Sequence, residues 1–347
     1  MWAENKVRIV DIAEELGVST ATVSNVIHGK TKKISSETVR RVQEKLEERG
    51  YIPNMAATLL AQNSSRIIGV VINDHEKYEG RALIDPFIAS SINYLTDEIE
   101  KNDYFIMLKK TTDLMEAVKF ASMWNMVGMV ILGFCDHEYQ KLRHSIHIPF
   151  VVYDGYFENK GRICNIQIDD LDGGCQVGRY LRGLGHKKVL CISDNQECMD
   201  RQRYNGLCNG LGFQADFMKI PMQKEARKCF YQENLARLRS FTAIFAVSDY
   251  YAVDLMGFLH SFGVKIPEDI SVIGFDNSPI CQQVVPSLTS VGQDYRLRAQ
   301  MAVRLLKQMK EQPEYTKDFL IPVELVERGS TTALKFSENN QYSSNFL

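Results

Sequence analysis

The chain has 347 residues, of which 45% are hydrophobic and 24% charged, and its formal net charge at pH 7 is −2. A chain of this length can form two or three domains, each with a core of its own. The near-neutral charge excludes a wholly basic surface of the kind that coats nucleic acid without sequence preference. Residues 1–66 are mildly basic, with ten Lys and Arg against eight Asp and Glu.

No pattern in the sequence indicates a membrane segment, a metal site or a cofactor. Charges occur within the first eight residues, and no unbroken apolar run is long enough to span a bilayer. The eight cysteines form no C-x-x-C pair, which favours reduced thiols acting as small apolar side chains over disulfides or a zinc site. We therefore expect a cytoplasmic protein without a membrane partner, a cofactor or a metal.

Three short helices are predicted in residues 7–50, where apolar side chains recur with helical periodicity. Gly17 is expected to end the first helix, and Ser19 is a suitable N-cap for the second. Ser35 or Ser36 can cap the third. A tight Gly-containing turn between the first two helices is typical of a helix-turn-helix.

The second of these helices has an unusually modest polar face. In GVSTATVSNVIHG, small hydroxyl and amide side chains surround an apolar stripe, and the stretch contains no Lys, Arg or Glu. Such residues are too small for a core, and they are placed too regularly for a loop. The pattern therefore indicates a helix with an apolar stripe and a polar face of small side chains.

A further short helix is predicted in YIPNMAATLLAQNSS, residues 51–65. Pro53 ends the preceding element and Asn54 can cap a new one. A helix of roughly two turns is marginal in water, where about 12–15 residues are usually needed. We therefore expect this helix to form only when a partner holds it, and the polar QNSS that follows to be a linker.

The remainder, to about Thr332, alternates apolar strand-like runs with amphipathic helices, which predicts a parallel α/β sheet. The predicted strands are RIIGVVI, YFIMLK, VGMVILGF, FVVYDGYF, KVLCIS, AIFAVSD and ISVIGFDN. Asp154, Asp249 and Asp276 each follow an apolar run, at the strand ends where open α/β sheets bind ligands. The alternative for each is to cap the helix that follows.

These segments together resemble the lactose/galactose repressor (LacI/GalR) family of transcriptional regulators over essentially the whole chain. The blocks that carry the resemblance, in the family's order and spacing, are VRIVDIAEELGVSTATVSNVIHG, RRVQEKLEERGYIPNMAATLLA, YLRGLGHKKV, RQRYNGL, VSDYYAVDLM, IPEDISVIGFDNSP, SLTSVGQDY and VERGSTT. The fold that the resemblance implies is α/β, with a three-helix headpiece, a hinge helix and a periplasmic-binding-protein-like core of two Rossmann-like subdomains.

The resemblance also implies domain boundaries. The domains are a headpiece (1–52), a hinge helix and linker (53–65), an effector-binding and dimerisation core (66–335) and a tail (336–347). The amino-terminal subdomain of the core covers about 66–165 and 293–320, and the carboxy-terminal subdomain about 166–292 and 321–335. The chain is expected to cross between them near Cys164 to Asp169, Gly292 to Asp294 and Ile321.

In the family the second helix lies in the DNA major groove, which explains its small polar side chains. By resemblance Ser19, Thr22 and Ser24 contact phosphates, whereas Thr20, Ala21 and Asn25 read bases. Asn25 stands where Arg is commoner, so adenine suits this position better than guanine. In the hinge helix, Leu60 matches a side chain that wedges into a minor-groove base step, with Asn54 and Ala57 alongside. Lys30, Lys32 and Lys33 either attract phosphate or form an ordinary solvated loop.

For the small-molecule effector, matching positions are Phe87, Asp154, Arg203, Ser248, Asp249 and Asp276. A guanidinium flanked by carboxylates suits the hydroxyl groups of a saccharide. Ser248 stands where many relatives have Asn, and NDHEKYEGRALIDPF is longer than the usual loop. A nucleobase, a phosphorylated metabolite or a protein co-effector therefore stays open as an alternative.

The resemblance implies a non-enzymatic regulator, expected to be a repressor, that binds palindromic operator DNA as a homodimer. The tail LKFSENNQYSSNFL lacks a leucine heptad, so we expect no tetramer. The alternatives are a solute-binding protein and an α/β enzyme acting on a sugar. The sequence lacks the G-x-S-x-G motif and two glycine-rich phosphate-binding motifs, G-x-x-x-x-G-K-[ST] and G-x-G-x-x-G after the first strand. Their absence counts against the enzyme alternative.

Overall fold

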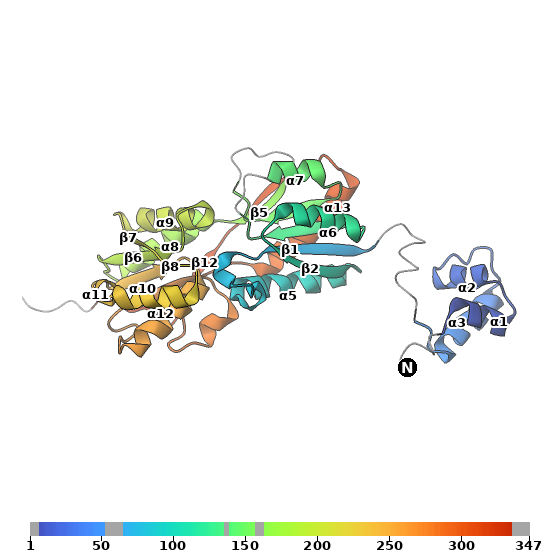
Figure 1. Ribbon diagram of the computed structural model, residues 1–347, viewed down its shortest axis with the longest axis horizontal. Coiled ribbons are helices and arrows are strands. Elements are labelled where there is room, and N and C mark those ends of the chain that lie inside the picture. Colours follow the sequence, from blue (N-terminus) through green and yellow to red (C-terminus); the bar gives the residue numbers. More distant parts are fainter. Residues whose placement is uncertain (1–6, 53–64, 135–138, 157–162, 335–347) are drawn as a thin grey trace, which may run out of the picture. The chain divides into compact units, whose positions relative to one another are not determined.

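The computed structural model describes residues 7–52, 65–134, 139–156 and 163–334. The chain forms two compact units, Met1–Ser65 and Arg66–Leu347 (Figure 1). Among the described residues, none of the helices combines the length and the apolar character needed to cross a membrane.

The first unit is a three-helix bundle of α1 (Ile9–Leu16), α2 (Thr20–Ile27) and α3 (Ser36–Glu48). The predicted helix boundaries are confirmed. Gly17 ends α1 in the left-handed conformation, with φ of 65°. The hydroxyls of Ser19 and Ser35 accept hydrogen bonds from backbone amides in the first turns of α2 and α3. The three helices bury a small core of Ile12, Ala13, Val23, Val26 and Val42.

The second unit contains two six-stranded sheets, each in a lobe of its own (Figure 1). The first lobe has the strand order β11-β5-β4-β3-β1-β2, and all its pairings are parallel. Its strands are β1 (Ile67–Asn73), β2 (Phe105–Thr111), β3 (Gly128–Leu132), β4 (Phe150–Tyr153), β5 (Cys164–Ile168) and β11 (Asp318–Ile321). Its helices are η1 (Glu76–Tyr78), η2 (Ala82–Ile84), α5 (Pro86–Lys101), α6 (Leu114–Met123), α7 (Tyr139–Ser145) and α13 (Tyr295–Glu311). Helix α5 packs beside α13, and α6 beside α7.

The second lobe has the order β12-β10-β9-β8-β6-β7 and is parallel except for β12, which runs antiparallel to β10. Its strands are β6 (Val189–Ser193), β7 (Asp216–Lys219), β8 (Ala243–Ala246), β9 (Ser271–Asp276), β10 (Thr289–Gly292) and β12 (Glu324–Val326). Its helices are α8 (Asp170–Gly183), α9 (Cys198–Leu211), α10 (Lys224–Glu233), α11 (Leu235–Leu238), α12 (Asp249–Ser261) and η3 (Pro279–Gln282). Helices α8 and α9 lie on one face of the sheet, and α10 and α12 on the other (Figure 1).

The chain passes between the lobes three times: after β5, after β10 and after β11. Two of the expected subdomain boundaries, after residues 165 and 320, fall inside strands. The reason is that β5 and β11 pair with each other up to Ile168 and Ile321, so both strands belong to the first lobe along their full length.

Helices α8 and α9 approach each other closely because glycines face the contact. A Cβ added at Gly206 would lie 2.0 Å from the carbonyl oxygen of Leu171, and one at Gly174 would lie 2.1 Å from that of Arg203. No side chain larger than hydrogen fits at either position. This contact fixes the position of α9, which carries Arg203.

Candidate functional site

Helix α2 presents its N-terminal turn to solvent. Ser19, Thr20 and Ala21 are exposed, and Thr22 and Asn25 are partly exposed. The Ser19 hydroxyl accepts a hydrogen bond from the Thr22 amide at 3.1 Å, so it acts as the N-cap. No acidic residue lies in the first turn. The positive end of the helix dipole is therefore free to attract an anion such as a phosphate.

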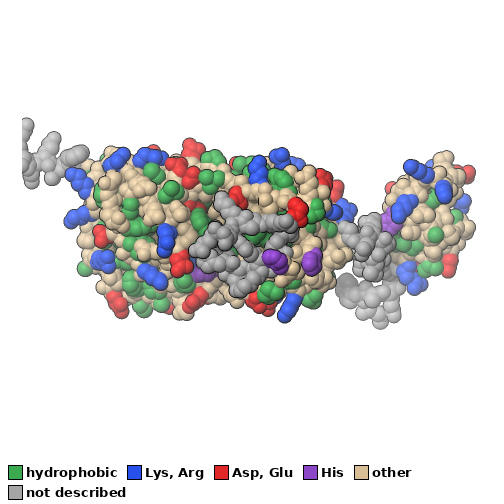
Figure 2. Space-filling view, turned by 90° about the horizontal axis from the view of Figure 1, so that it is seen from above, with side chains coloured by type: hydrophobic (Ala, Val, Ile, Leu, Met, Phe, Trp, Pro, Cys, Tyr) green, Lys and Arg blue, Asp and Glu red, His purple; other side chains and the backbone are tan. Residues whose placement is uncertain are grey.

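The other residues predicted to contact DNA fall into two groups. Ser24 is partly exposed on α2, and Lys30, Lys32 and Lys33 lie exposed in the segment before α3. Lys and Arg side chains are visible on the surface of this unit in Figure 2. Asn54, Ala57 and Leu60 lie outside the described residues.

In the second unit, a cavity of about 120 Å³ lies where the carboxyl ends of strands from both sheets meet. We call it the interlobe cavity. The first lobe contributes His75, Lys77, Tyr78, Asp85, Phe87, Gly133 and Asp154, and the second Asp194, Asn195, Glu197, Met199, Asp200, Arg203, Ser248 and Asp276. Five of the six predicted effector residues thus line it, and Asp249 does not.

Asp154 enters the cavity directly after β4, in the left-handed conformation with φ of 54°. Its Oδ2 accepts a hydrogen bond of 2.7 Å from the buried guanidinium of Arg298 on α13. Its Oδ1 is buried and has no hydrogen-bond partner. The carboxylate therefore keeps one acceptor oxygen without a donor.

Asp276 ends β9 on the opposite side of the cavity. Its Oδ1 accepts a hydrogen bond of 2.9 Å from the Gln293 amide, and the Gln293 carbonyl oxygen accepts from Arg298. Burial raises the pKa of Asp276 well above its usual range, and nearby Asp249 adds to the effect. Arg298 and Gln293 thus connect the two carboxylates by buried hydrogen bonds through the crossover after β10.

Arg203 projects from α9 and is 5% exposed. Its Nε donates to Asp170 on α8 at 2.7 Å, and Nη1 donates to the carbonyl oxygen of Val247 at 2.5 Å. The guanidinium also lies 3.7 Å from the ring centroid of Phe275. Burial opposes its charge, but the carboxylates of Asp170, Asp276 and Asp200 together outweigh burial and raise the pKa of Arg203.

Asp249, which was predicted to contact the effector, does not line the interlobe cavity. Its Oδ2 accepts from the amide and hydroxyl of Ser278, both at 2.8 Å, and from Cys281 at 3.1 Å, and its Oδ1 accepts from Ser290 at 2.6 Å. These donors hold the carboxylate against β9 and leave it no capacity for a ligand. Ser248 lines the cavity and also caps α12, since its hydroxyl accepts a hydrogen bond from the Tyr251 amide at 3.4 Å.

Two groups of cavity residues were not predicted. Asp194 and Asp200 flank the start of α9, where Asn195 donates to both, and Asp194 follows the strand KVLCIS as the strand-end rule would have indicated. Burial raises the pKa of Asp200 to about 6, with nearby Asp194 adding to the rise. The other group, including Lys77 and Asp85, comes from the long loop 74–85.

Loop 74–85 belongs to the first lobe and contacts the second. The carboxylate of Glu79 accepts from the amide of Lys224, the first residue of α10, at 3.1 Å. Gln223, which has no capping side-chain bond of its own, donates to Glu76 at 3.1 Å. The first lobe therefore caps a helix of the second. The same loop places the Lys77 ammonium 4.9 Å from the ring centroid of Tyr78.

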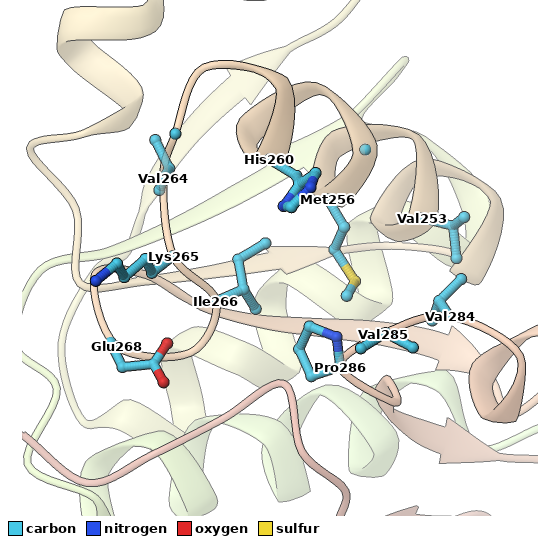
Figure 3. Close-up of a pocket in the computed structure, with 12 residues that line it drawn as sticks. Val253, Met256, His260, Val264, Lys265, Ile266, Glu268, Val284, Val285 and Pro286 are labelled. Atoms are coloured by element: carbon cyan, nitrogen blue, oxygen red, sulfur yellow. The ribbon is translucent and has the colours of Figure 1, made fainter.

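A second depression is apolar and lies on the second lobe (Figure 3). It has a volume of about 630 Å³ and lies between α12 and the loops around residues 264–268 and 284–286. We call it the apolar hollow. Met256, Ile266 and Val284 point into it in Figure 3, and Val285 at its edge is 96% exposed. An exposed apolar surface of this kind marks a contact site.

Comparison with known proteins gives two family matches. Residues 8–54 match the model of bacterial regulatory proteins of the lacI family, and residues 179–331 match a periplasmic binding protein-like domain. The transcriptional repressor CytR of Escherichia coli (strain K12) is 28% identical over 343 residues, covering 95% of this chain and 98% of that protein.

Among solved structures, the lac repressor dimer bound to operator and the anti-inducer ONPF has a TM-score of 0.79 and 23% identity. The match covers 94% of this chain and 99% of the lac repressor chain. A lacI family regulator from Enterococcus faecium with bound ribose has a TM-score of 0.67 and 24% identity, and it covers 78% of this chain and 100% of its own.

Proposed function

Because the chain belongs to the lacI family of bacterial regulatory proteins, we propose that it is a sequence-specific DNA-binding transcriptional repressor. In this proposal, a small molecule bound in the interlobe cavity controls the affinity of the chain for its operator. The curated relative CytR is a transcriptional repressor, which favours regulation over the catalytic and transport alternatives.

The observation that carries the proposal is the exposed face of α2. Its first turn combines small uncharged side chains, a capped N-terminus and no acidic residue. Small side chains let the backbone approach the edges of bases in the major groove, which a bulkier residue would prevent. We assign Thr20, Ala21 and Asn25 to base contacts and Ser19, Thr22 and Ser24 to phosphates. The hinge residues Asn54, Ala57 and Leu60 stay assigned to the minor groove.

For the effector we propose a saccharide-like molecule. Arg203, Asp154 and Asp276 supply a fixed donor and two acceptors, which suits a ring of hydroxyl groups. The solved regulator with bound ribose supports this class of ligand. Phe87 and Ser248 complete the contact set, whereas Asp249 is assigned to positioning β9.

We also propose that two copies form the functional unit. A helix-turn-helix reads one half-site, so two copies reading two half-sites require a palindromic operator. The apolar hollow is the surface that a second copy would cover, because it is lined mainly by apolar side chains and Val285 at its edge is 96% exposed. The lac repressor was solved as a dimer on its operator, which supports this assembly.

Selection of binding sites from random duplex DNA by the full chain, at one fixed salt concentration, tests the proposal. We expect enrichment of an inverted repeat and affinity for it at least about a thousandfold above that for unrelated DNA. Retention of all sequences alike, with only the salt-dependent affinity of a basic surface, would contradict sequence-specific binding.

A further inference from the structure

We propose that the molecule bound in the interlobe cavity carries a protonated amine as well as hydroxyl groups. This inference rests on the proposed function of the cavity as the effector site, and it narrows the chemical class of the effector to a compact hydroxylated amine such as an amino sugar.

The first observation is an excess of negative charge. Six carboxylates line the interlobe cavity, whereas its lining contains two permanent cations, Lys77 and Arg203. Arg203 is already committed, because it pairs with Asp170 at 2.7 Å behind the cavity wall and donates to the carbonyl oxygen of Val247. Buried carboxylates need a charged or donating partner. Even when Arg298, which pairs with Asp154 from outside the lining, is added, six carboxylates face three permanent cations.

The second observation is the unused oxygen of Asp154. This residue is 5% exposed, its Oδ2 is occupied by Arg298, and its Oδ1 has no donor although it is buried at a residue that lines the cavity. A buried acceptor without a partner is rare in folded proteins. A ligand that donates here satisfies it, and a charged N–H donor forms a stronger bond to a carboxylate than a neutral hydroxyl does.

Asp276 offers a second acceptor on the opposite wall. Gln293 occupies Oδ1 and leaves Oδ2 for a ligand. Burial raises the pKa of Asp85, Asp200 and Asp276, and in Asp200 and Asp276 neighbouring carboxylates raise it further. A neutral polyol does not relieve this crowding, whereas an ammonium group does.

Two aromatic side chains of the cavity also favour a positively charged ligand. Lys77 lies 4.9 Å from the ring centroid of Tyr78, and the guanidinium of Arg298 lies 5.8 Å from that of Phe87. Both rings line the cavity. Aromatic faces attract cations through the ring quadrupole. Carboxylates and aromatic rings, the two groups that bind an ammonium ion in a desolvated site, thus make up about half of the residues that line the cavity.

The size of the cavity limits the ligand. At about 120 Å³ it is smaller than the pockets of roughly 300–1,000 Å³ that hold drug-sized molecules. A single sugar ring is the scale of ligand that fits with little movement of the lobes, whereas a nucleotide or an oligosaccharide requires the cavity to open.

The test is calorimetry and thermal shift on the full chain with matched ligand series at neutral pH. Each series contains an amino sugar (glucosamine, galactosamine or mannosamine), the parent hexose and the N-acetyl derivative, in which the amine is no longer charged. Putrescine supplies an amine without hydroxyl groups. We expect one amino sugar to bind at least about tenfold tighter than its two matched partners and than putrescine.

Substitutions test whether the amine of the ligand contacts Asp154. Asp154→Asn keeps the size of the side chain and removes its charge, and we expect it to weaken amino-sugar binding about tenfold or more while changing hexose binding much less. Asp216→Asn, on exposed β7 of the second lobe, is the matched control and should change neither. Circular dichroism verifies that each variant is folded. The ligand series measured on the parent chain tests the inference even if a variant does not fold.

Three results would overturn the inference: equal or tighter binding of the hexose or the N-acetyl sugar, binding of putrescine as tight as that of the amino sugar, or no binding of any amine at about 10 mM. These binding measurements are made without DNA. Their outcome is therefore independent of the operator selection that tests the proposed function. A chain that selects an operator but binds only neutral sugars would retain the proposed function and lose this inference.

Discussion

Arg203 holds the second lobe together as well as facing the interlobe cavity. Its partner Asp170 is 2% exposed, and the two side chains pair at 2.7 Å. Removing one partner of a buried pair leaves an uncompensated charge, which costs about 3–5 kcal/mol. We therefore expect Arg203→Ala to lower the free energy of unfolding by that amount, measured by urea denaturation. Arg201→Ala, exposed on the same helix, should change it by less than about 0.5 kcal/mol. Equal effects of the two would show that the pair does not stabilise the fold.

Asp200 makes the stability of the second unit depend on pH. Burial raises its pKa to about 6, against about 3.9 in an unfolded chain. The folded state thus binds the proton more tightly, so this contribution to stability is complete below about pH 4 and is lost as the pH rises to about 6. Asp200→Asn should remove the dependence and raise the free energy of unfolding at neutral pH by about 1–3 kcal/mol.

Urea denaturation of the parent chain and of Asp200→Asn, repeated between about pH 4 and 8, measures both quantities. Asp216→Asn serves as the control because Asp216 is exposed. A variant with the parent's slope between pH 4 and 6 would mean that another group carries the proton.

Single residues also mark the limit of what the sequence predicts. The strand-end rule correctly brought Asp154 and Asp276 to one cavity, but it could not separate them from Asp249. That distinction depends on Ser278, Cys281 and Ser290, which donate to Asp249 from other elements. The end of a strand predicts where an Asp side chain lies. Its neighbours in the folded protein determine whether its carboxylate can still bind a ligand.

At the level of elements, the contact between α8 and α9 determines where Arg203 lies. A methyl group at Gly206 would overlap the backbone of α8, and forced overpacking costs about 1–3 kcal/mol. Gly206→Ala should therefore lower the thermal midpoint and weaken ligand binding, because α9 must move away. Gly183→Ala on α8, where an added Cβ meets nothing, should instead stabilise by up to about 1 kcal/mol through helix propensity. A neutral Gly206→Ala would contradict close helix packing as the cause.

The predicted strands were those with long apolar runs, and each appears as a strand of the structure. The unpredicted strands β5, β7, β10, β11 and β12 mix apolar with polar residues, as in CNIQI, DFMK and TSVG, so they show no long apolar run. Loop 74–85 was recognised as long, but its contacts with α10 join residues about 145 positions apart. No local pattern encodes such a contact, so the first-lobe half of the cavity was only partly predicted.

At the level of the whole molecule, the apolar hollow should join two copies. Val285 is 96% exposed at its edge, and a carboxylate there would be buried without a partner in a dimer. Val285→Asp should weaken dimerisation at least about tenfold, measured by sedimentation at micromolar concentration. Met123→Asp, at a residue 78% exposed on the first lobe, should leave the dimer intact. Dimerisation unchanged by Val285→Asp would place the interface elsewhere.

The central claim is that the polar face of α2 reads base sequence. Asn25 is partly exposed on this helix, and an amide in the major groove can bond two edges of an adenine. Selection from random DNA by the parent chain and by Asn25→Ala, at the same salt concentration, tests the claim most directly. The variant should bind the parent's operator about 1–3 kcal/mol more weakly and lose preference at one symmetric position in each half-site. Selection of the same operator with the same stringency by both proteins would contradict it.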